Sequence, residues 1–317
     1  MMKAPDLICI VGPTASGKTA LAAEIAKKVS GEVVSADSMQ IYRGMDIATA
    51  KPDEAEKQGV PHHMLDILEP GEEYSVKRYV EDASLCIEDI KKRGGVPIVC
   101  GGTGLYIDSL LKGRDFAKGI EDKSLRENLI NRAEDEGGAK LLRELSEFDP
   151  ESAARLHEND IKRIVRAIEV YSLTGKTISE HNKFSKTLPP RYTSVKIGLS
   201  FSDRAELYER INLRVDEMLK KGLIEEARRL FEAGKLKGTA LQAIGYKELL
   251  RAFNGECTTD EAADKLKTET RRYAKRQITW FSRDDEIKWV IREKRDTFER
   301  IFQISMDYLN AAGIESL

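Results

Sequence analysis

The segment 12–19 constrains the fold of this chain more than any other feature. It reads G-P-T-A-S-G-K-T, follows the apolar run 7–11 and leads into the helix-forming run 20–26. This order of strand, glycine-rich loop and helix is the context that a phosphate-binding P-loop requires. Glycines let backbone N–H groups turn inward around an anion, and the helix N-terminus adds its positive end. The segment therefore predicts a site for a phosphate chain without specifying which molecule carries it.

Individual positions of the P-loop have distinct expected parts. Lys18 reaches the terminal phosphate oxygens, and Thr19 offers its hydroxyl to a Mg²⁺ ion bound to those oxygens. The alternative is a chance combination of glycine and lysine in a loop, which the flanking strand and helix disfavour. The residues expected to surround the phosphates are Gly12, Pro13, Thr14, Ala15, Ser16, Gly17, Lys18 and Thr19.

Strand and helix patterns alternate over the first hundred residues. The runs 32–35 and 96–100 are typical of buried strands, and the segment 76–93 between them has helical character. This alternation predicts right-handed βαβ units, and hence an α/β fold in which helices flank a parallel sheet. Ligands of such sheets gather beyond the carboxyl ends of the strands, where the P-loop, Asp37 and Thr103 all lie. We therefore expect these three elements to meet at one site.

The segment 113–186 differs in character from the rest of the chain. It is highly charged, contains no convincing strand, and has its clearest helical patterns at 124–136 and 160–173. A proline-containing boundary at 188–191 follows, and the run 194–200 resembles a returning strand of the sheet. The expected domains are a P-loop core, 1–112 with 187–317, and an inserted helical domain, 113–186. Further elements expected in the core are helices at 204–221, 223–233, 246–253 and 259–281 and a strand at 287–291.

Composition limits the remaining function classes. The formal net charge is −2, so a surface for nucleic acid has to be a local patch. The four cysteines have no C-x-x-C spacing, and we expect reduced thiols in a cytoplasmic protein without a zinc site. The longest apolar runs are far shorter than the roughly 18 residues of a membrane span, so no membrane partner is expected. His62 and His63 have no third ligand nearby in sequence, and we interpret them as a loop or packing pair.

Asp37 is the acidic residue that follows the second predicted strand. In a P-loop domain this position suggests Mg²⁺ binding or recognition of the group that accepts the transferred moiety. The alternative interpretation is a helix N-cap, which aspartate favours. Three residues later Gln40 carries an amide that can pair with a nucleobase edge, as glutamine does with adenine.

A basic and aromatic segment, 270–283, lies near the C-terminus. It contains five cations, no acid and three aromatic residues, and helical spacing places Arg272, Lys275 and Arg276 on one face. Basic side chains beside aromatic rings suit RNA binding, whereas the alternative is a solvated helix with an aromatic core stripe. Arg214, one turn after Arg210, is either a second clamp on a diphosphate or a helix-surface partner of Glu206 or Glu217.

Seven separated motifs together resemble one family. The chain closely resembles the bacterial tRNA dimethylallyltransferases, also called tRNA isopentenyltransferases, over essentially its whole length. The motifs are 12–19, S-A-D-S-M-Q-I-Y at 35–42, A-T-A-K-P at 48–52, H-H-M-L-D at 62–66, G-G-T-G-L-Y at 101–106, Q-A-I-G-Y-K-E at 242–248 and the helix 272–281.

The resemblance implies a specific reaction. Dimethylallyl diphosphate would donate its five-carbon group to the exocyclic N6 amine of the adenine 3′ of the anticodon, in tRNAs that read codons starting with U. The P-loop would hold the diphosphate leaving group, with Lys18 and Arg214 neutralising its growing charge. Asp37 would accept the amine proton or hold the amine for attack, and Thr103 would hydrogen-bond near the reacting groups. The target base has to leave the anticodon-loop stack, so base flipping is expected.

The resemblance also implies which residues contact the tRNA anticodon stem-loop. Judged from the residues alone, the basic edge at 161–166 is equally compatible with a solvated helix face, and the segment 242–247 with a structural turn. The implied contacts are Asp37, Ser38, Met39, Gln40, Thr103, Arg126, Ile161, Lys162, Arg163, Ile164, Val165, Gln242 and Lys247, and the basic helix adds Arg272 and Arg276.

Three other functions remain open at this point. A small-molecule kinase of the same fold would use ATP, and Asp37 would activate a hydroxyl group. A prenyltransferase acting on free adenine nucleotides would have no need of the long insertion. An RNA-binding NTPase switch would show NTP turnover without group transfer. For the function that the resemblance implies we expect a monomer, because tRNA has to enter between the core and the insertion and the sequence contains no heptad seam.

Overall fold

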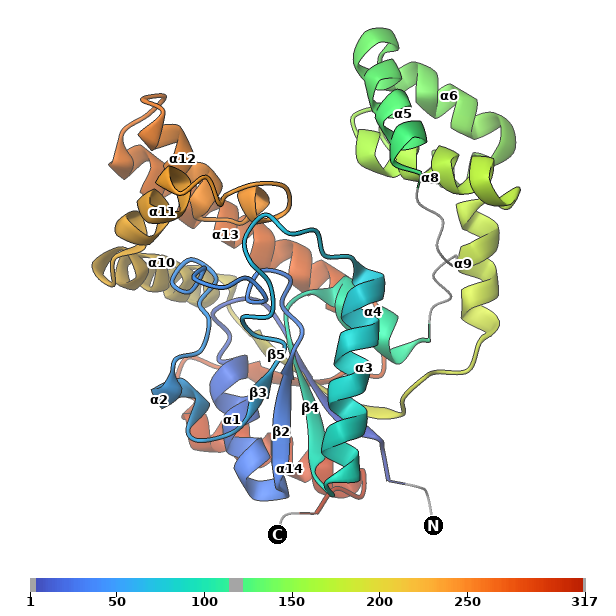
Figure 1. Ribbon diagram of the computed structural model, residues 1–317. Helices are drawn as coiled ribbons and strands as arrows, with labels where there is room; N and C mark the ends of the chain where they lie inside the picture. Colours follow the sequence, from blue (N-terminus) through green and yellow to red (C-terminus); the bar gives the residue numbers. More distant parts are fainter. Residues whose placement is uncertain (1–3, 114–121, 316–317) are drawn as a thin grey trace. The chain divides into compact units, whose positions relative to one another are not determined.

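The computed structural model describes residues 4–113 and 122–315, and at its centre lies a parallel β-sheet (Figure 1). The sheet has six strands in the order β3-β2-β4-β1-β5-β6, and every neighbouring pair in it is parallel. Helices flank the sheet, so the predicted α/β fold is confirmed. The strands are β1 (Leu7–Val11), β2 (Gly31–Ser35), β3 (His62–His63), β4 (Val96–Gly101), β5 (Ser194–Phe201) and β6 (Lys288–Arg292).

Strand β1 occupies the interior of the sheet. It pairs with β4 on one side and β5 on the other, so that Cys9 lies opposite both Val99 and Lys196. All five residues of β1 are buried, because neighbouring strands and helices surround it. This burial explains why the sequence shows an unbroken apolar run at this strand instead of an alternating one. The P-loop consequently begins in the middle of the carboxyl edge of the sheet.

Helices cover both faces of the sheet and its carboxyl edge. Helices α1 and α14 share a core with one face, while α3 and α4 lie over the other (Figure 1). Helices α10 to α13 form a second apolar core with the segment that follows β2. These elements are α1 (Lys18–Val29), α2 (Glu54–Lys57), α3 (Val76–Lys92), α4 (Gly104–Leu111), α10 (Arg204–Lys220), α11 (Leu223–Glu232), the 3-10 helix η1 (Ala240–Gln242), α12 (Tyr246–Phe253), α13 (Thr259–Phe281) and α14 (Phe298–Ala311).

The chain divides into two compact units. The first consists of Met1–Leu111 and Tyr192–Leu317 and contains the sheet, and the second consists of Lys112–Arg191. The described part of the second unit is helical and has its own apolar core, which includes Leu129, Leu141 and Ile168. No helix in the described part of either unit is long and apolar enough to cross a membrane. The helices of the second unit are α5 (Lys123–Glu136), α6 (Gly138–Phe148), α7 (Pro150–Ala153), α8 (Ile161–Thr174) and α9 (Ile178–Thr187).

Of the two alternatives for His62 and His63, a loop or a packing pair, the loop is wrong. They form the short strand β3, which pairs in parallel with β2 at the edge of the sheet. The Nε2 atom of His63 lies 2.7 Å from Oε2 of Glu32, a β2 residue. A strand of two polar residues has no apolar alternation, so sequence periodicity carries no signal for it.

Asp149 links two helices of the second unit through a buried carboxylate. Its side chain accepts hydrogen bonds from the backbone N–H and the hydroxyl of both Ser152 and Ser179, over 2.6–3.2 Å. Burial alone would raise the pKa of Asp149, but these four hydrogen bonds outweigh it and hold the pKa below its usual value.

Replacing Asp149 with alanine should therefore destabilise the helical unit. Because four donors lose their acceptor in a buried position, we expect a loss of roughly 2–4 kcal/mol in the free energy of unfolding, measured by urea denaturation. The stabilising effect in the wild type should be present above the unfolded-state pKa and be lost as the pH falls through the lower folded-state pKa. The exposed residue Asp135 provides a matched control, since D135A should change stability little. Equal denaturation midpoints for D149A and D135A would contradict this assignment.

Candidate functional site

The P-loop connects β1 to α1 with a backbone that only certain residues adopt readily. Gly12 and Gly17 have positive φ angles of 142° and 91°, and Ala15 has φ 61°. A Cβ atom at Gly12 would lie 2.5 Å from the carbonyl oxygen of Leu199 in β5, so glycine is required there sterically as well. Arg210 of α10 donates from Nε to the carbonyl oxygen of Ala15 at 3.2 Å and supports the strained residue.

Lys18 and Arg214 bring two cations to this loop. The Lys18 ammonium donates to the carbonyl oxygen of Pro13 at 2.6 Å, and burial lowers the pKa of Lys18 to about 8. Burial also lowers the pKa of Arg214, which projects from α10, although Glu56 and Asp37 oppose that shift. In the described part of the chain Arg214 makes no ion pair within 4.0 Å, so pairing with Glu206 or Glu217 does not occur. Both cations are therefore available to an anion.

A cavity of about 290 Å³ lies beside the P-loop, within the sheet-containing unit. Residues from the P-loop, the segment after β2, α10, η1, α12 and α13 line it, although these segments are far apart in sequence. The predicted site residues that line the cavity are Thr14, Ala15, Lys18, Thr19, Asp37, Ser38, Met39, Gln40, Arg214, Gln242, Lys247 and Arg276.

Asp37 lies at the carboxyl end of β2 with one oxygen committed to the protein. Its Oδ1 atom accepts hydrogen bonds from the backbone N–H groups of Met39 at 2.9 Å and Gln40 at 3.3 Å. The cap-like geometry of the alternative interpretation is thus present, but among the described residues it does not engage Oδ2. Burial raises the pKa of Asp37, against the opposing effects of these N–H groups, Lys18 and Arg214. A carboxylate with one available oxygen and a raised pKa can accept a proton.

Thr103 fixes the Asp37 loop from the second glycine-rich turn. Its Oγ1 atom accepts a hydrogen bond from the backbone N–H of Ser38 at 3.1 Å, and its own N–H donates to Ala36 at 3.1 Å. Tyr273 of α13 lines the cavity beside this pair, and burial and the nearby Asp37 raise the pKa of its hydroxyl. The sequence pattern assigns the functional face of α13 to Arg272, Lys275 and Arg276 and does not predict that Tyr273 lines the cavity. The spacing of Tyr273, Gln277 and Trp280 at i, i+4 and i+7 provides the signal for a second functional face.

The sequence predicts that the Gln40 amide pairs with a nucleobase edge, but in the structure this amide hydrogen-bonds the protein itself. Its Nε2 atom donates to the carbonyl oxygens of both Thr49 and Ala50 at 3.1 Å, and its Oε1 atom accepts from the Ser35 hydroxyl at 3.2 Å. Both amide protons are therefore used within the protein. Gln40 lines the cavity as a fixed element of its wall, because the loop carbonyls need donors of their own.

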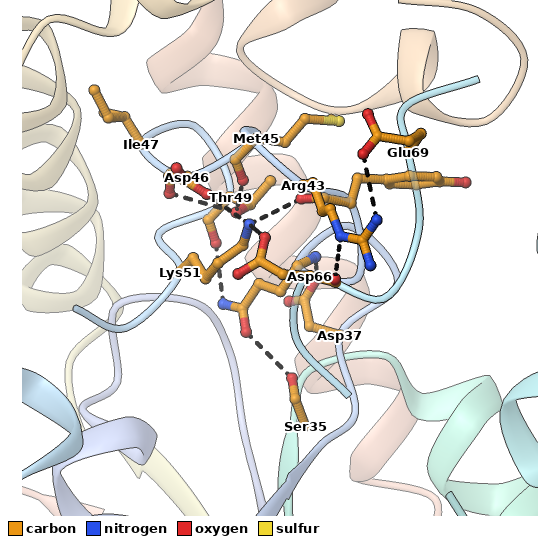
Figure 2. A network of polar contacts seen from close by, with 12 residues as sticks. Ser35, Asp37, Arg43, Met45, Asp46, Ile47, Thr49, Lys51, Asp66 and Glu69 are labelled. Atoms are coloured by element: carbon orange, nitrogen blue, oxygen red, sulfur yellow. Dashed lines mark hydrogen bonds and ion pairs between the residues drawn. The ribbon is translucent and has the colours of Figure 1, made fainter. Parts of the chain in front are cut away.

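Two charged side chains anchor the segment 42–51, whose carbonyl oxygens accept hydrogen bonds from Gln40. Figure 2 shows Lys51 beside Asp46 and Asp66, whose carboxylates accept hydrogen bonds from its ammonium group, each at 2.5 Å. The same ammonium group donates to the carbonyl oxygen of Tyr42 at 2.8 Å. The Lys51 side chain is only 6% exposed, so these three acceptors replace the water that its protons would otherwise bind.

Glu226 of α11 provides the second anchor for the same segment. Its buried carboxylate accepts hydrogen bonds from the backbone N–H groups of Asp46, Ile47 and Ala48 at 3.0–3.3 Å and from the Tyr246 hydroxyl at 2.6 Å. Sequence reasoning missed this anchor, because its parts are nearly 180 positions apart.

Of the other RNA contacts predicted in the core, three residues line the cavity and one does not. Gln242 and Lys247 border it on either side of Gly245, whose φ angle of 106° permits the tight entry into α12. Arg276 lines the cavity, whereas Arg272 is exposed and pairs with Glu269 at 2.8 Å.

In the helical unit the predicted contacts divide by exposure. Lys162 and Arg163 are exposed on α8, and Arg126 of α5 pairs with the buried Glu169 at 3.0 Å. Ile164 and Val165 are 0% and 2% exposed in the core of the unit, so the expectation that their side chains contact RNA is corrected. The amphipathic pattern of α8 turns these two apolar side chains inward, while Ile161 is partly buried against the same core.

Comparisons with known proteins agree with the resemblance. A family model described as IPP transferase matches residues 40–284, and one described as isopentenyl transferase matches residues 5–69. The tRNA dimethylallyltransferase of Acetivibrio thermocellus is 49% identical over 98% of this chain and 99% of its own length. The crystal structure of the tRNA isopentenylpyrophosphate transferase from Bacillus halodurans superposes with a TM-score of 0.71 at 40% identity, covering 97% of each chain. A eukaryotic dimethylallyltransferase acting on tRNA superposes with a TM-score of 0.81 at 31% identity, covering 96% of this chain and 79% of that one.

Binding of an anion at the P-loop should depend on pH through Lys18. Because the ammonium form binds anions, the contribution of Lys18 to affinity for inorganic diphosphate should be full below its pKa and decline as the pH rises through that pKa, which is about 8 in the free protein. We expect K18M to weaken binding roughly 10- to 100-fold and to remove this part of the pH dependence, measured by calorimetric titration. The exposed Lys28 on the same helix supplies the control K28M. The same pH dependence in K18M and wild type would exclude Lys18 as the titrating group.

Replacing Glu226 with glutamine should loosen the wall of the cavity. The new amide group would turn N–H donors toward backbone N–H groups, so we expect a loss of roughly 2–3 kcal/mol in stability. The exposed Glu232 on the same helix supplies the control E232Q. Thermal denaturation checks stability, and protection of the amides of residues 46–48 from hydrogen exchange checks the local effect. Unchanged exchange at these amides in E226Q would argue against the anchoring role.

Proposed function

The chain belongs to the IPP transferase family of tRNA dimethylallyltransferases, enzymes that modify tRNA, and from this premise we propose its substrates and mechanism. The donor is dimethylallyl diphosphate, and the acceptor is the exocyclic N6 amine of the adenine 3′ of the anticodon, in tRNAs that read codons starting with U. The protein acts as a monomer in the cytoplasm. The observation that carries the proposal is the meeting of the P-loop, Arg214 and Asp37 in one cavity.

The proposed transfer uses the two ends of this cavity differently. The N6 nitrogen attacks C1 of the dimethylallyl group, the bond between C1 and the bridging oxygen breaks, and its electron pair leaves with diphosphate. The displaced N6 proton passes to the Asp37 carboxylate. Burial raises the pKa of Asp37, which makes this carboxylate a better proton acceptor. Lys18 and Arg214 offset the negative charge that develops on the leaving diphosphate. Thr103 supports the base-side loop through its hydrogen bond with Ser38.

A Mg²⁺ ion fits the proposed diphosphate end. Mg²⁺ prefers oxygen ligands and usually keeps waters while binding substrate phosphates, so it requires few protein ligands. The hydroxyl of Thr19 lines the cavity directly after Lys18 and supplies one such oxygen. The described residues contain no cluster of three or more His, Cys, Asp or Glu side chains that could hold a metal, which favours a site completed by the substrate. When bound, the ion would neutralise charge on the diphosphate oxygens.

The proposed tRNA contacts come from both units. Near the cavity, Lys247 and Arg276 supply cations for phosphates, and Ser38 and Met39 adjoin the space for the flipped adenine. In the helical unit, Lys162, Arg163 and Arg126 supply further cations for the anticodon stem, so that this unit acts as a tRNA-binding domain. The net charge of −2 means that such local patches, and not the overall field, attract the RNA.

Transfer of labelled dimethylallyl diphosphate to unmodified tRNA with Mg²⁺ tests this proposal. Label should appear at the adenine 3′ of the anticodon with the wild type, while D37A should lose transfer and the exposed control D285N should retain it. ATP serves as an alternative donor in parallel. Passage of phosphate from ATP to a small acceptor, without prenyl transfer, would replace the proposal with a kinase.

The pH–rate profile separates two roles of Asp37. Because burial raises the pKa of Asp37, a general base would lose activity on the acidic side, through a pKa above that of ordinary aspartate. The D37N variant should then lack this acidic limb and retain only slow transfer. A deficit in D37N that leaves the acidic limb unchanged would assign Asp37 an orienting role instead.

A further inference from the structure

One face of α13 packs directly against the second glycine-rich turn, residues 101–104. A Cβ atom at Gly102 would lie 2.0 Å from Nε2 of Gln277, and one at Gly104 would lie 2.3 Å from Cδ1 of Trp280. Only glycine therefore permits this approach. The indole Nε1 of Trp280 donates to Oδ2 of Asp108 on α4 at 3.1 Å, which fixes the rotation of α13 about its axis.

Gln277 connects this turn to the P-loop through one buried amide. Its Oε1 atom accepts a hydrogen bond from the backbone N–H of Thr14 at 2.8 Å, and its Nε2 atom donates to the carbonyl oxygen of Gly102 at 3.0 Å. The side chain is 5% exposed. The amide orientation is determined, because a reversed amide would set donor against donor and acceptor against acceptor.

The position of Thr14 gives this contact its importance. Thr14 directly precedes Ala15, whose φ of 61° lies in the left-handed region. Turns that contain such a residue can direct successive backbone N–H groups toward an anion. A loop with such angles is held only if its surroundings determine it. Pro13, the residue before Thr14, has no N–H of its own, so the Thr14 N–H is the first backbone donor of the loop after Gly12.

We propose that Gln277 is a positioning residue for the diphosphate site, which holds the P-loop backbone in its anion-binding form through the N–H of Thr14. The inference rests on the proposed binding of a diphosphate by the P-loop. Gln277 acts through Thr14, and not as a ligand, because its amide oxygen and amide nitrogen are already hydrogen-bonded to Thr14 and Gly102. The same helix carries Arg276 at the cavity, so the element that faces the RNA also sets the form of the diphosphate site.

The variant Q277M tests this role, since methionine has a similar length and lacks both hydrogen-bonding functions. Leaving the Thr14 N–H and the Gly102 carbonyl unpaired should weaken binding of inorganic diphosphate with Mg²⁺ roughly 10- to 100-fold in calorimetric titration. The KM for the prenyl donor should rise by a similar factor. The affinity for an anticodon stem-loop RNA should change by less than about threefold, because Gln277 is not expected to contact the RNA. If Gln277 only stabilised the fold, Q277M would weaken the binding of diphosphate and of RNA to a similar extent.

A second variant keeps the proposal testable if Q277M folds poorly. In Q277E the ionised carboxylate still accepts from Thr14 but repels the carbonyl oxygen of Gly102, whereas the protonated form offers one acceptor to Thr14 and one donor to Gly102, as glutamine does. Diphosphate affinity relative to the wild type at the same pH should therefore be reduced at pH 8 and recover toward pH 5. The exposed Gln303 on α14 supplies the control Q303M, which should match the wild type.

The outcomes separate the two proposals. Wild-type binding of diphosphate together with equal binding by Q277M, or a pH-independent defect in Q277E, would overturn the role of Gln277 and leave the proposed function standing. A wild type that transfers the prenyl group but binds no inorganic diphosphate would overturn the role of Gln277 and of the P-loop cradle alike.

Discussion

The site depends on side chains that satisfy the backbone of loops at the carboxyl edge of the sheet. Beyond the strands, the chain loses the ladder that pairs its N–H and C=O groups, yet much of this backbone is buried and needs partners. Lys51 and Glu226 supply them for the segment after β2, and Thr103 supplies one for the turn that carries Asp37. Gln277 does the same for the P-loop. The geometry of the cavity is thus a consequence of hydrogen-bond satisfaction at long sequence separation.

Electrostatics within the cavity follow from this arrangement. The P-loop, the segment after β2 and helix α10 bring two cations and one carboxylate to one cavity, where burial disfavours each charged form. The pKa of Lys18 falls and that of Asp37 rises, and the attraction between them only partly offsets these shifts. A diphosphate would supply the missing negative charge beside Lys18 and Arg214. Burial that disfavours the charged forms of these groups also strengthens their electrostatic interaction with an anion.

The sequence predicted the elements well and their mutual contacts poorly, for physical reasons. The P-loop, the buried strands and Asp37 have local signals, because period, glycine position and strand order are properties of short segments. The roles of Gln40 and Gln277 have no such signal, because the sequence shows that an amide is present but not whether its partner is a ligand or a loop carbonyl. Ile164 and Val165 illustrate the opposite error, because the resemblance implies RNA contacts along the whole run 161–165, whereas helical periodicity places these two side chains in a core. The helices α6, α7 and α9 were not separated, because the charged insertion has similar character throughout.

The two glycine-rich turns show how one sequence signal can have two physical meanings. In the P-loop, Gly12 and Gly17 have positive φ angles, and glycine is needed there for the backbone conformation. Gly102 and Gly104 are not among the glycines with positive φ, and glycine is needed there because Gln277 and Trp280 occupy the space of a Cβ atom. The first turn thus shapes a binding surface, and the second admits a helix. Since Gln277 hydrogen-bonds both turns, the close approach at Gly102 brings the amide that pairs with the Thr14 N–H next to the residue before the strained Ala15.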